Sequence, residues 1–175
     1  MEIYSQLKNV FSKIANSKDE DGKTPLINAV ERGYLTMIHF LIENGADVNV
    51  QDLSGSTPLH NAAVHDHNEV AKSLIENGAD VDSTNVLEMT PLHIASHKGK
   101  AGVVKYLLEN GAEVDTKEKY GFTPLWLASG RGHLESVKYL IEFKAEVNIK
   151  CTMNNYLPLH IAAQKDHIEV DKLFV

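Results

Sequence analysis

Histidines are the first candidates for chemistry, because the chain of 175 residues contains nine of them. His93 and His97 lie four residues apart, which on a helix is the spacing of a two-histidine zinc face. His65, Asp66 and His67 form a second local cluster. No glutamate follows His93 as in the His-Glu-x-x-His motif of metalloproteases, and no cysteine pair accompanies any histidine. We therefore expect these histidines to be structural and to bind no metal.

Nucleophiles and phosphate-binding loops are the other candidates. Cys151 is the one thiol, so no internal disulfide can form, and no basic cluster lies near it in the sequence to activate it. The segment Gly130-Arg131-Gly132 resembles part of a phosphate-binding loop, but it follows an expected helix rather than a strand and lacks the remaining glycines and the lysine. We therefore expect no catalytic residue and no cofactor, and we predict that the protein is not an enzyme.

Composition excludes further classes of protein. The chain has 17 Lys and Arg residues against 24 Asp and Glu residues, so its net charge is −7, and 43% of its residues are hydrophobic. These proportions are typical of a folded globular protein. No apolar run approaches the roughly 18 residues that a membrane span requires, so we expect no membrane insertion. The acidic balance, with Lys and Arg forming no stripe, predicts that nucleic acid is not a partner.

A regular internal repeat organises most of the chain. The tripeptide Thr-Pro-Leu begins at equal intervals, at Thr24, Thr57, Thr90 and Thr123, and an altered copy with one extra residue before it is Leu157-Pro158-Leu159. A second marker, with the pattern Asp/Glu-Val-Asn/Asp, ends at the same intervals, at Asn49, Asp82, Asp115 and Asn148. Because two independent markers keep one period, the sequence is an array of similar units.

Each unit predicts two short helices. The threonine before each proline suits a helix N-cap, and proline suits the first helical turn because its missing N–H would be unpaired there. Gly99, for example, ends the first helix of one unit, and Val104 and Leu107 follow at helical spacing in the second. A single unit cannot bury its apolar face, whereas stacked units can.

With these markers the sequence resembles the ankyrin-repeat protein family. The resemblance rests on TPLHNAA at 57–63, TPLHIAS at 90–96, TPLWLAS at 123–129, LPLHIAA at 157–163 and the GADV loops at 45–48 and 78–81. It covers about residues 19–175. It implies an all-α ankyrin-repeat solenoid of stacked helix–turn–helix units with β-turn or hairpin loops. It also implies that His60, His93 and His160 hydrogen-bond to neighbouring turns.

The repeat period divides the chain into six segments of one continuous domain. They are an N-terminal capping helix at 1–18, repeats at 19–51, 52–84, 85–117 and 118–150, and a partial or capping fifth repeat at 151–175. In the cap we expect one apolar face, formed by Ile3, Leu7, Val10, Phe11 and Ile14, to pack on the first repeat. We expect the array to continue beyond Val175, because solenoids usually end in a polar capping repeat.

Three departures from the repeat predict local strain or remodelling. Glu88 stands where other repeats have a turn glycine, and Lys144 replaces the glycine that closes a second helix. If the backbone is left-handed there, each substitution costs on the order of 1–2 kcal/mol. The extra residue near Asn154 and Asn155 predicts a remodelled turn in the fifth repeat.

The candidate binding surface comes from the resemblance, which implies that turn tips and first helices line a concave face where partners bind. The predicted partner-binding residues are Leu53, Val64, His65, Val86, Leu87, Met89, His97, Lys98, Lys119, Tyr120, Phe122, Trp126, Arg131, Met153 and Tyr156. Turn tips are normally polar, so the apolar and aromatic residues among them favour an interface. The alternative is that Val86 and Leu87 fold inward to repack their turn, and that Tyr156 fills space beside the insertion.

These features predict a monomeric, non-catalytic protein–protein interaction module, a scaffold or adaptor whose partner is another protein. The lone cysteine and the charged N-terminal segment, unlike a signal peptide, predict a cytoplasmic (intracellular) location. One alternative is the cytosolic ankyrin segment of a larger channel, toxin or enzyme, and another is a host-directed bacterial effector. The resemblance also implies that Asn49 and Asn148 are possible substrates of an asparaginyl hydroxylase, although we expect their main role to be a capping hydrogen bond.

Overall fold

The computed structural model describes the backbone of residues 2–174 and the side chains of residues 6 and 9–174. Within these residues the chain is all-α, with eleven α-helices, a short 3₁₀ helix and no strand. The chain divides into two compact units, Met1–Asp80 and Val81–Val175. The prediction of one continuous domain with the six boundaries given above stays a prediction.

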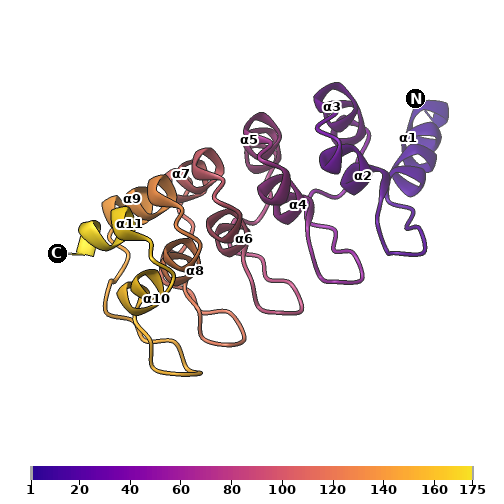
Figure 1. Cartoon of the computed structure of the whole chain (residues 1–175). Coiled ribbons are helices and arrows are strands. Elements are labelled where there is room, and N and C mark those ends of the chain that lie inside the picture. The colour runs from indigo at the N-terminus through magenta and orange to yellow at the C-terminus, as the bar shows by residue number, and fades with distance from the viewer. Residues whose placement is uncertain (1, 175) are drawn as a thin grey trace. The chain divides into compact units, whose positions relative to one another are not determined.

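The first unit contains the capping helix and two helix pairs. Its helices are α1 (Glu2–Ala15), α2 (Pro25–Glu31), α3 (Leu35–Glu43), α4 (Pro58–His65) and α5 (Asn68–Glu76). Helix α2 packs on α3 and α4 on α5, and the two pairs stack through α2 against α4 and α3 against α5 (Figure 1). The first helices therefore form one layer and the second helices another.

The second unit repeats this arrangement three times. Its helices are α6 (Pro91–Lys98), α7 (Ala101–Glu109), α8 (Pro124–Gly130), α9 (Leu134–Glu142), α10 (Pro158–Gln164), α11 (Ile168–Asp171) and the 3₁₀ helix η1 (Lys172–Phe174). Helices α6, α8 and α10 lie side by side in one row, and α7, α9 and α11 form the second row (Figure 1). The expectation of an all-α array of stacked helix pairs is confirmed.

Apolar side chains of the first helices fill the centre of each unit. Leu26 and Leu59 in the first unit and Leu92 and Leu125 in the second are fully buried. Burying one such side chain contributes roughly 2 kcal/mol. Ala95 is also fully buried and, because it is small, it lets the backbones of neighbouring helices approach closely.

The motif histidine joins adjacent repeats. Nδ1 of His93 accepts a hydrogen bond from the backbone N–H of Thr90 at 3.1 Å. On the other side of the ring, Nε2 lies 3.1 Å from the carbonyl oxygen of Thr116 and 3.2 Å from that of Phe122. Both acceptors are carbonyls, so Nε2 carries the proton. The implied bridge to a neighbouring turn is therefore confirmed for His93, and both ring nitrogens are occupied by the fold.

A second histidine contact repeats at the start of the second helices. Nε2 of His133 lies 3.1 Å from the carbonyl oxygen of His97 in the preceding repeat, and Nε2 of His67 lies 3.4 Å from that of Glu31. The His133 ring lies against Gly99, where an added Cβ would come within 2.5 Å of it. Glycine is thus required at position 99, both because φ is +69° there and because this ring approaches closely.

Helix α1 contacts the first repeat with a different face from the one predicted. The side chains of Val10, Phe11 and Ile14 are 53%, 46% and 59% exposed, whereas Ala15 is buried. The prediction that these three side chains pack on the first repeat is therefore wrong. The side chains of Ile3 and Leu7 lie outside the described residues.

Two hydrogen bonds made by Asn16, the residue after α1, explain why this helix docks as it does. Its Oδ1 accepts from the backbone N–H of Asp47 at 2.8 Å, and its Nδ2 donates to the carbonyl oxygen of Gly45 at 2.8 Å. Asn49, which lies one repeat later, makes the same pair of bonds, to the N–H of Asp80 at 2.8 Å and the carbonyl oxygen of Gly78 at 3.0 Å. The predicted capping role of Asn49 is confirmed.

The strained turns lie at the positions that the sequence analysis predicted. Glu88 has φ +59° and Lys144 has φ +71°, and both are exposed. Asp66 and Asp166 are also left-handed, at +62° and +61°, but aspartate tolerates this conformation better than glutamate or lysine. In the fifth repeat Asn155 is left-handed at +57°, which accommodates the inserted residue.

Replacing Glu88 by glycine should raise the free energy of unfolding by about 1 kcal/mol, because the relief of left-handed strain exceeds the entropy that glycine adds to the unfolded chain. Lys144→Gly should give a similar gain. Urea unfolding followed by circular dichroism measures both. The matched control is Lys72→Gly on the exposed side of α5, which should lose about 1 kcal/mol. A loss at Glu88 or Lys144 as large as that at Lys72 would contradict the strain assignment.

Candidate functional site

Each repeat begins with a turn tip, a hairpin-like loop whose two ends are joined by a backbone hydrogen bond. In the second unit the N–H of Asn85 donates to the carbonyl oxygen of Met89, and that of Glu118 to Phe122, both at 3.1 Å. In the fifth repeat the bond joins Cys151 to Tyr156 at 3.0 Å and encloses the extra residue. The predicted remodelling of this turn is confirmed.

A side-chain acceptor at the base of each tip holds its shape. Oε1 of Glu118 accepts from the N–H of Tyr120 at 2.9 Å and of Phe122 at 3.0 Å. Oδ1 of Asn85 makes the equivalent pair of bonds to the N–H of Leu87 and of Met89. Sequence reasoning missed this role. The signal for it was a side-chain acceptor at the same position of four successive repeats, namely Asp19, Asp52, Asn85 and Glu118.

Cys151 occupies the same position in the fifth repeat and cannot replace a carboxylate or amide acceptor. Its buried thiol instead donates to Oδ1 of Asn154 at 2.8 Å, and this oxygen also accepts from the N–H of Tyr156. The fifth tip is therefore supported from within its own insertion. The thiol is packed into the fold and is not presented to solvent.

The apolar side chains at the tips of the second unit point outward. Val86 is 63% exposed, Leu87 40%, Tyr120 45% and Met153 69%. The alternative in which Val86 and Leu87 fold inward is not what the structure shows. Tyr156 is half-buried and stacks on the ring of His160, with 5.6 Å between ring centroids.

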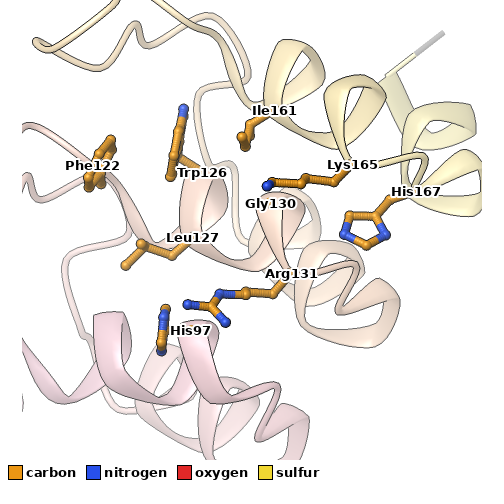
Figure 2. Close-up of a pocket in the computed structure, with 9 residues that line it drawn as sticks. All are labelled: His97, Phe122, Trp126, Leu127, Gly130, Arg131, Ile161, Lys165 and His167. Atoms are coloured by element: carbon orange, nitrogen blue, oxygen red, sulfur yellow. The ribbon is translucent and has the colours of Figure 1, made fainter.

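Two adjoining cavities lie beside these tips and together form what we name the groove. The larger, about 670 Å³, is lined by His97, Phe122, Trp126, Leu127, Gly130, Arg131, Ile161, Lys165 and His167 (Figure 2). The smaller, about 360 Å³, is lined by Leu87, Met89, Ile94, His97, Lys98, Glu118, Tyr120, Phe122 and Leu127. The groove runs over three successive repeats of the second unit.

Phe122 and Trp126 form one wall of the larger cavity. Their rings stack with 4.0 Å between centroids and 19° between planes. Trp126 takes the place of the motif histidine, so it cannot make the bridge that His93 makes. Its indole Nε1–H is buried and has no hydrogen-bond acceptor among the described residues, which costs about 1–3 kcal/mol.

The groove gathers most of the predicted partner-binding residues. Those that line it are Leu87, Met89, His97, Lys98, Tyr120, Phe122, Trp126 and Arg131. Val86, Lys119, Met153 and Tyr156 belong to the tips of the same unit but do not line either cavity. Leu53, Val64 and His65 belong to the first unit, where Leu53 is 74% exposed.

The groove is positively charged. Lys98, Arg131 and Lys165 line it and form no ion pair with any described residue. The side chain of Arg131 extends toward His97 (Figure 2). Burial lowers the pKa of His97, and the nearby cations Arg131 and Lys98 lower it further. The statement that Lys and Arg form no stripe is therefore wrong for the second unit, because the repeat aligns these three cations.

Sequence reasoning also missed an exposed apolar patch in the first unit. Tyr34, Met37 and Phe40 at α3 are 56%, 49% and 50% exposed and border a cavity of about 620 Å³. The signal was the absence of any charged residue in α3 before Glu43, whereas α7 carries Lys105 on its exposed side. The residues that line this cavity all lie between Tyr34 and Phe40, so the patch is confined to one helix and its N-cap.

Other kinds of site find little support in the residues that the structure describes. They contain no group of three or more histidine, cysteine, aspartate or glutamate side chains placed to hold a metal ion. None of the described helices has both the length and the apolar character needed to cross a membrane.

Comparison with known proteins decides the family. A family model described as ankyrin repeats in three copies matches residues 2–85, 45–118 and 92–175. The chain belongs to the ankyrin-repeat family. A relative from Acanthamoeba polyphaga mimivirus, itself named as a putative ankyrin repeat protein, is 45% identical over 47 residues, which is 27% of this chain and 25% of that protein. Ankyrin repeats are generally non-catalytic and generally bind other proteins.

Glu118→Leu should lower the free energy of unfolding by about 2 kcal/mol, because the N–H groups of Tyr120 and Phe122 lose their common acceptor. Glu118→Gln should change it by less than about 0.5 kcal/mol, since an amide oxygen does this work at Asn85. Urea unfolding of the two variants measures the difference. Equal losses for both would show that charge, rather than the acceptor, matters at this position.

Acid should destabilise the fold in a window that opens near pH 6.5, through His97 and His133, because burial lowers the pKa of both below the ordinary histidine value. In this window the unfolded chain binds more protons than the folded one, so the free energy of unfolding falls as the pH drops below about 6.5. Thermal melts across the window measure it. His97→Gln should reduce the slope, and an unchanged slope would contradict the contribution of His97.

Proposed function

We propose that this chain is a protein-binding module that holds a segment of a partner protein in the groove of the second unit. The observation that carries the proposal is the line of exposed apolar side chains at the tips, above all Leu87 and Tyr120, beside the stacked pair Phe122 and Trp126. The exposure of such side chains to water is unfavourable, and a partner that covers them removes this apolar area from solvent.

Rigidity of the tips supports the proposal. Each tip is closed by a backbone hydrogen bond and braced by a side-chain acceptor, as Glu118 braces Tyr120 and Phe122. Because the tip is already ordered, binding costs little conformational entropy there. Most of the free energy gained by burying the apolar area of the tip residues therefore contributes to binding.

The chemistry of the groove supports protein as the ligand. Aromatic residues, methionine and arginine are the types enriched at the centres of protein interfaces, and the groove contains Phe122, Met89 and Arg131. Leucine and tyrosine at the rim offer contacts to side chains of a partner. The scaffold or adaptor role, with the chain as a monomer in the cytoplasm, is part of the same proposal.

The double substitution Tyr120→Ser and Phe122→Ser should abolish partner binding, because it removes the apolar rim and one member of the stacked pair. Quantitative affinity capture from the source cell, with purified wild-type and variant chains as bait, should show partners that are lost with the variant. Direct titration with each purified partner then measures the loss, followed by the fluorescence of Trp126, the one tryptophan in the chain.

The matched control is Tyr34→Ser with Phe40→Ser, which removes the same residue types from the exposed side of α3. This variant should retain the partners, and both double variants should keep melting temperatures within a few degrees of the wild type. A partner that is lost equally from both variants, or retained by both, would contradict binding at the groove.

A further inference from the structure

The three groove cations occupy one repeated position. Lys98, Arg131 and Lys165 follow each other one repeat apart, and the second interval contains the inserted residue. Lys98 is the last residue of α6, and Arg131 and Lys165 are the C-caps of α8 and α10. Because α6, α8 and α10 stack side by side, the three charged groups form a row along the groove.

Helix stability explains only part of this row. A cation at a helix C-terminus gains about 0.3–1 kcal/mol from the helix dipole, which accounts for a basic residue at each position. It does not account for the absence of counter-charges among the described residues. The ion pairs that the described side chains form involve Lys23, Lys105, Lys138 and Lys172, none of which lines the groove.

The carboxylates that face the row do not neutralise it. Glu118 is the only acidic residue among those that line the two cavities, so a single negative charge faces the three cations. The groove is therefore a basic strip on a chain whose net charge is −7. Like charges held together without partners destabilise the free protein and favour an anionic ligand.

We infer that the groove binds an extended acidic peptide segment whose carboxylates pair with Lys98, Arg131 and Lys165 while an apolar or aromatic side chain packs against Phe122 and Trp126. This inference rests on the proposed function and specifies the chemistry of its partner. The guanidinium of Arg131 can bind a carboxylate through two parallel hydrogen bonds. The lysines act as point charges that tolerate either aspartate or glutamate.

The repeat sets the spacing of the acidic residues. Packed helices lie about 8–10 Å apart, so neighbouring cations in the row are separated by about that distance along the groove. A peptide in the extended polyproline II conformation advances about 3.1 Å per residue with three residues per turn, so every third side chain lies on the same face. The best ligand therefore carries an acidic residue at every third position, with the apolar side chain between two of them.

A peptide suits the groove better than a nucleic acid does. A nucleic acid carries one negative charge on every phosphate, and those outside the groove would be repelled by a chain with 24 acidic residues. A short acidic segment confines its charge to the row. The apolar rim at Leu87 and Tyr120 then covers the apolar side chains of the segment.

The test starts from a display library of fully randomised linear peptides selected on the full chain. The selected peptides should be rich in Asp and Glu, with acidic residues three positions apart, and should contain an aromatic residue or leucine. Fluorescence of Trp126 then reports their affinity. The double variant Arg131→Glu with Lys165→Glu should weaken binding by about tenfold or more, which corresponds to about 1.4 kcal/mol or more.

The matched control is Lys117→Glu with Lys150→Glu, which makes the same change of net charge at exposed residues of the same unit that do not line the groove. It should change affinity by less than about twofold, and melting curves should show both variants folded. Raising the salt concentration from about 50 to about 500 mM should weaken the wild-type complex much more than that of the Arg131→Glu, Lys165→Glu variant.

Other outcomes would overturn the inference in distinguishable ways. Selection of apolar peptides without acidic residues, with affinity unchanged by Arg131→Glu and Lys165→Glu but lost with Tyr120→Ser and Phe122→Ser, would overturn acidic recognition and leave the proposed function standing. Tighter binding of single-stranded oligodeoxythymidine than of any selected peptide would overturn a peptide as ligand. Peptides that bind equally well to all variants would overturn both the acidic groove and the proposed site.

Discussion

Every repeat in this chain depends on a neighbour to complete it. A pair of helices seven to nine residues long cannot enclose a core, and its turn leaves backbone carbonyls that need donors. His93 answers both requirements at once, since its ring is buried in one repeat and its Nε2–H donates to Thr116 and Phe122 at the border of the next. Within each unit the side chains at equivalent positions therefore lie in rows.

The rows explain how a binding surface arises from a repeat that is mainly structural. The same period that places glycines, histidines and capping amides also places Lys98, Arg131 and Lys165 in line. A basic residue stabilises the C-terminus of its own helix, and the stacking of the helices places the three basic residues in one row. Selection for a ligand can then act on tip residues such as Tyr120 without disturbing the core, because the tip is braced by Glu118.

The sequence predicted the parts of this fold that depend on periodic and local rules. The helix pairs, the left-handed backbone at Glu88 and Lys144, and the altered turn near Asn155 follow from spacing and from the steric preferences of single residues. The identity of the groove residues could be predicted only as positions on a family surface. Their convergence around two cavities depends on side-chain packing between repeats, which no spacing rule contains.

Two further features escaped prediction for physical reasons. The apolar residues Val10, Phe11 and Ile14 suggested which face of α1 docks, but hydrogen bonds from Asn16 fix the helix in another orientation. The bracing role of Glu118 is a bond from side chain to backbone, so it depends on the tip geometry rather than on residue type alone.

Trp126 changes the link between the fourth and fifth repeats. Where His93 donates across a border, the indole of Trp126 has no acceptor among the described residues, and the hydroxyl of Thr152 donates to the carbonyl oxygen of Tyr120 instead. Ile161 and Lys165 line the groove on the far side of that border, so a ligand in the groove contacts both of the repeats that Trp126 leaves without this hydrogen bond.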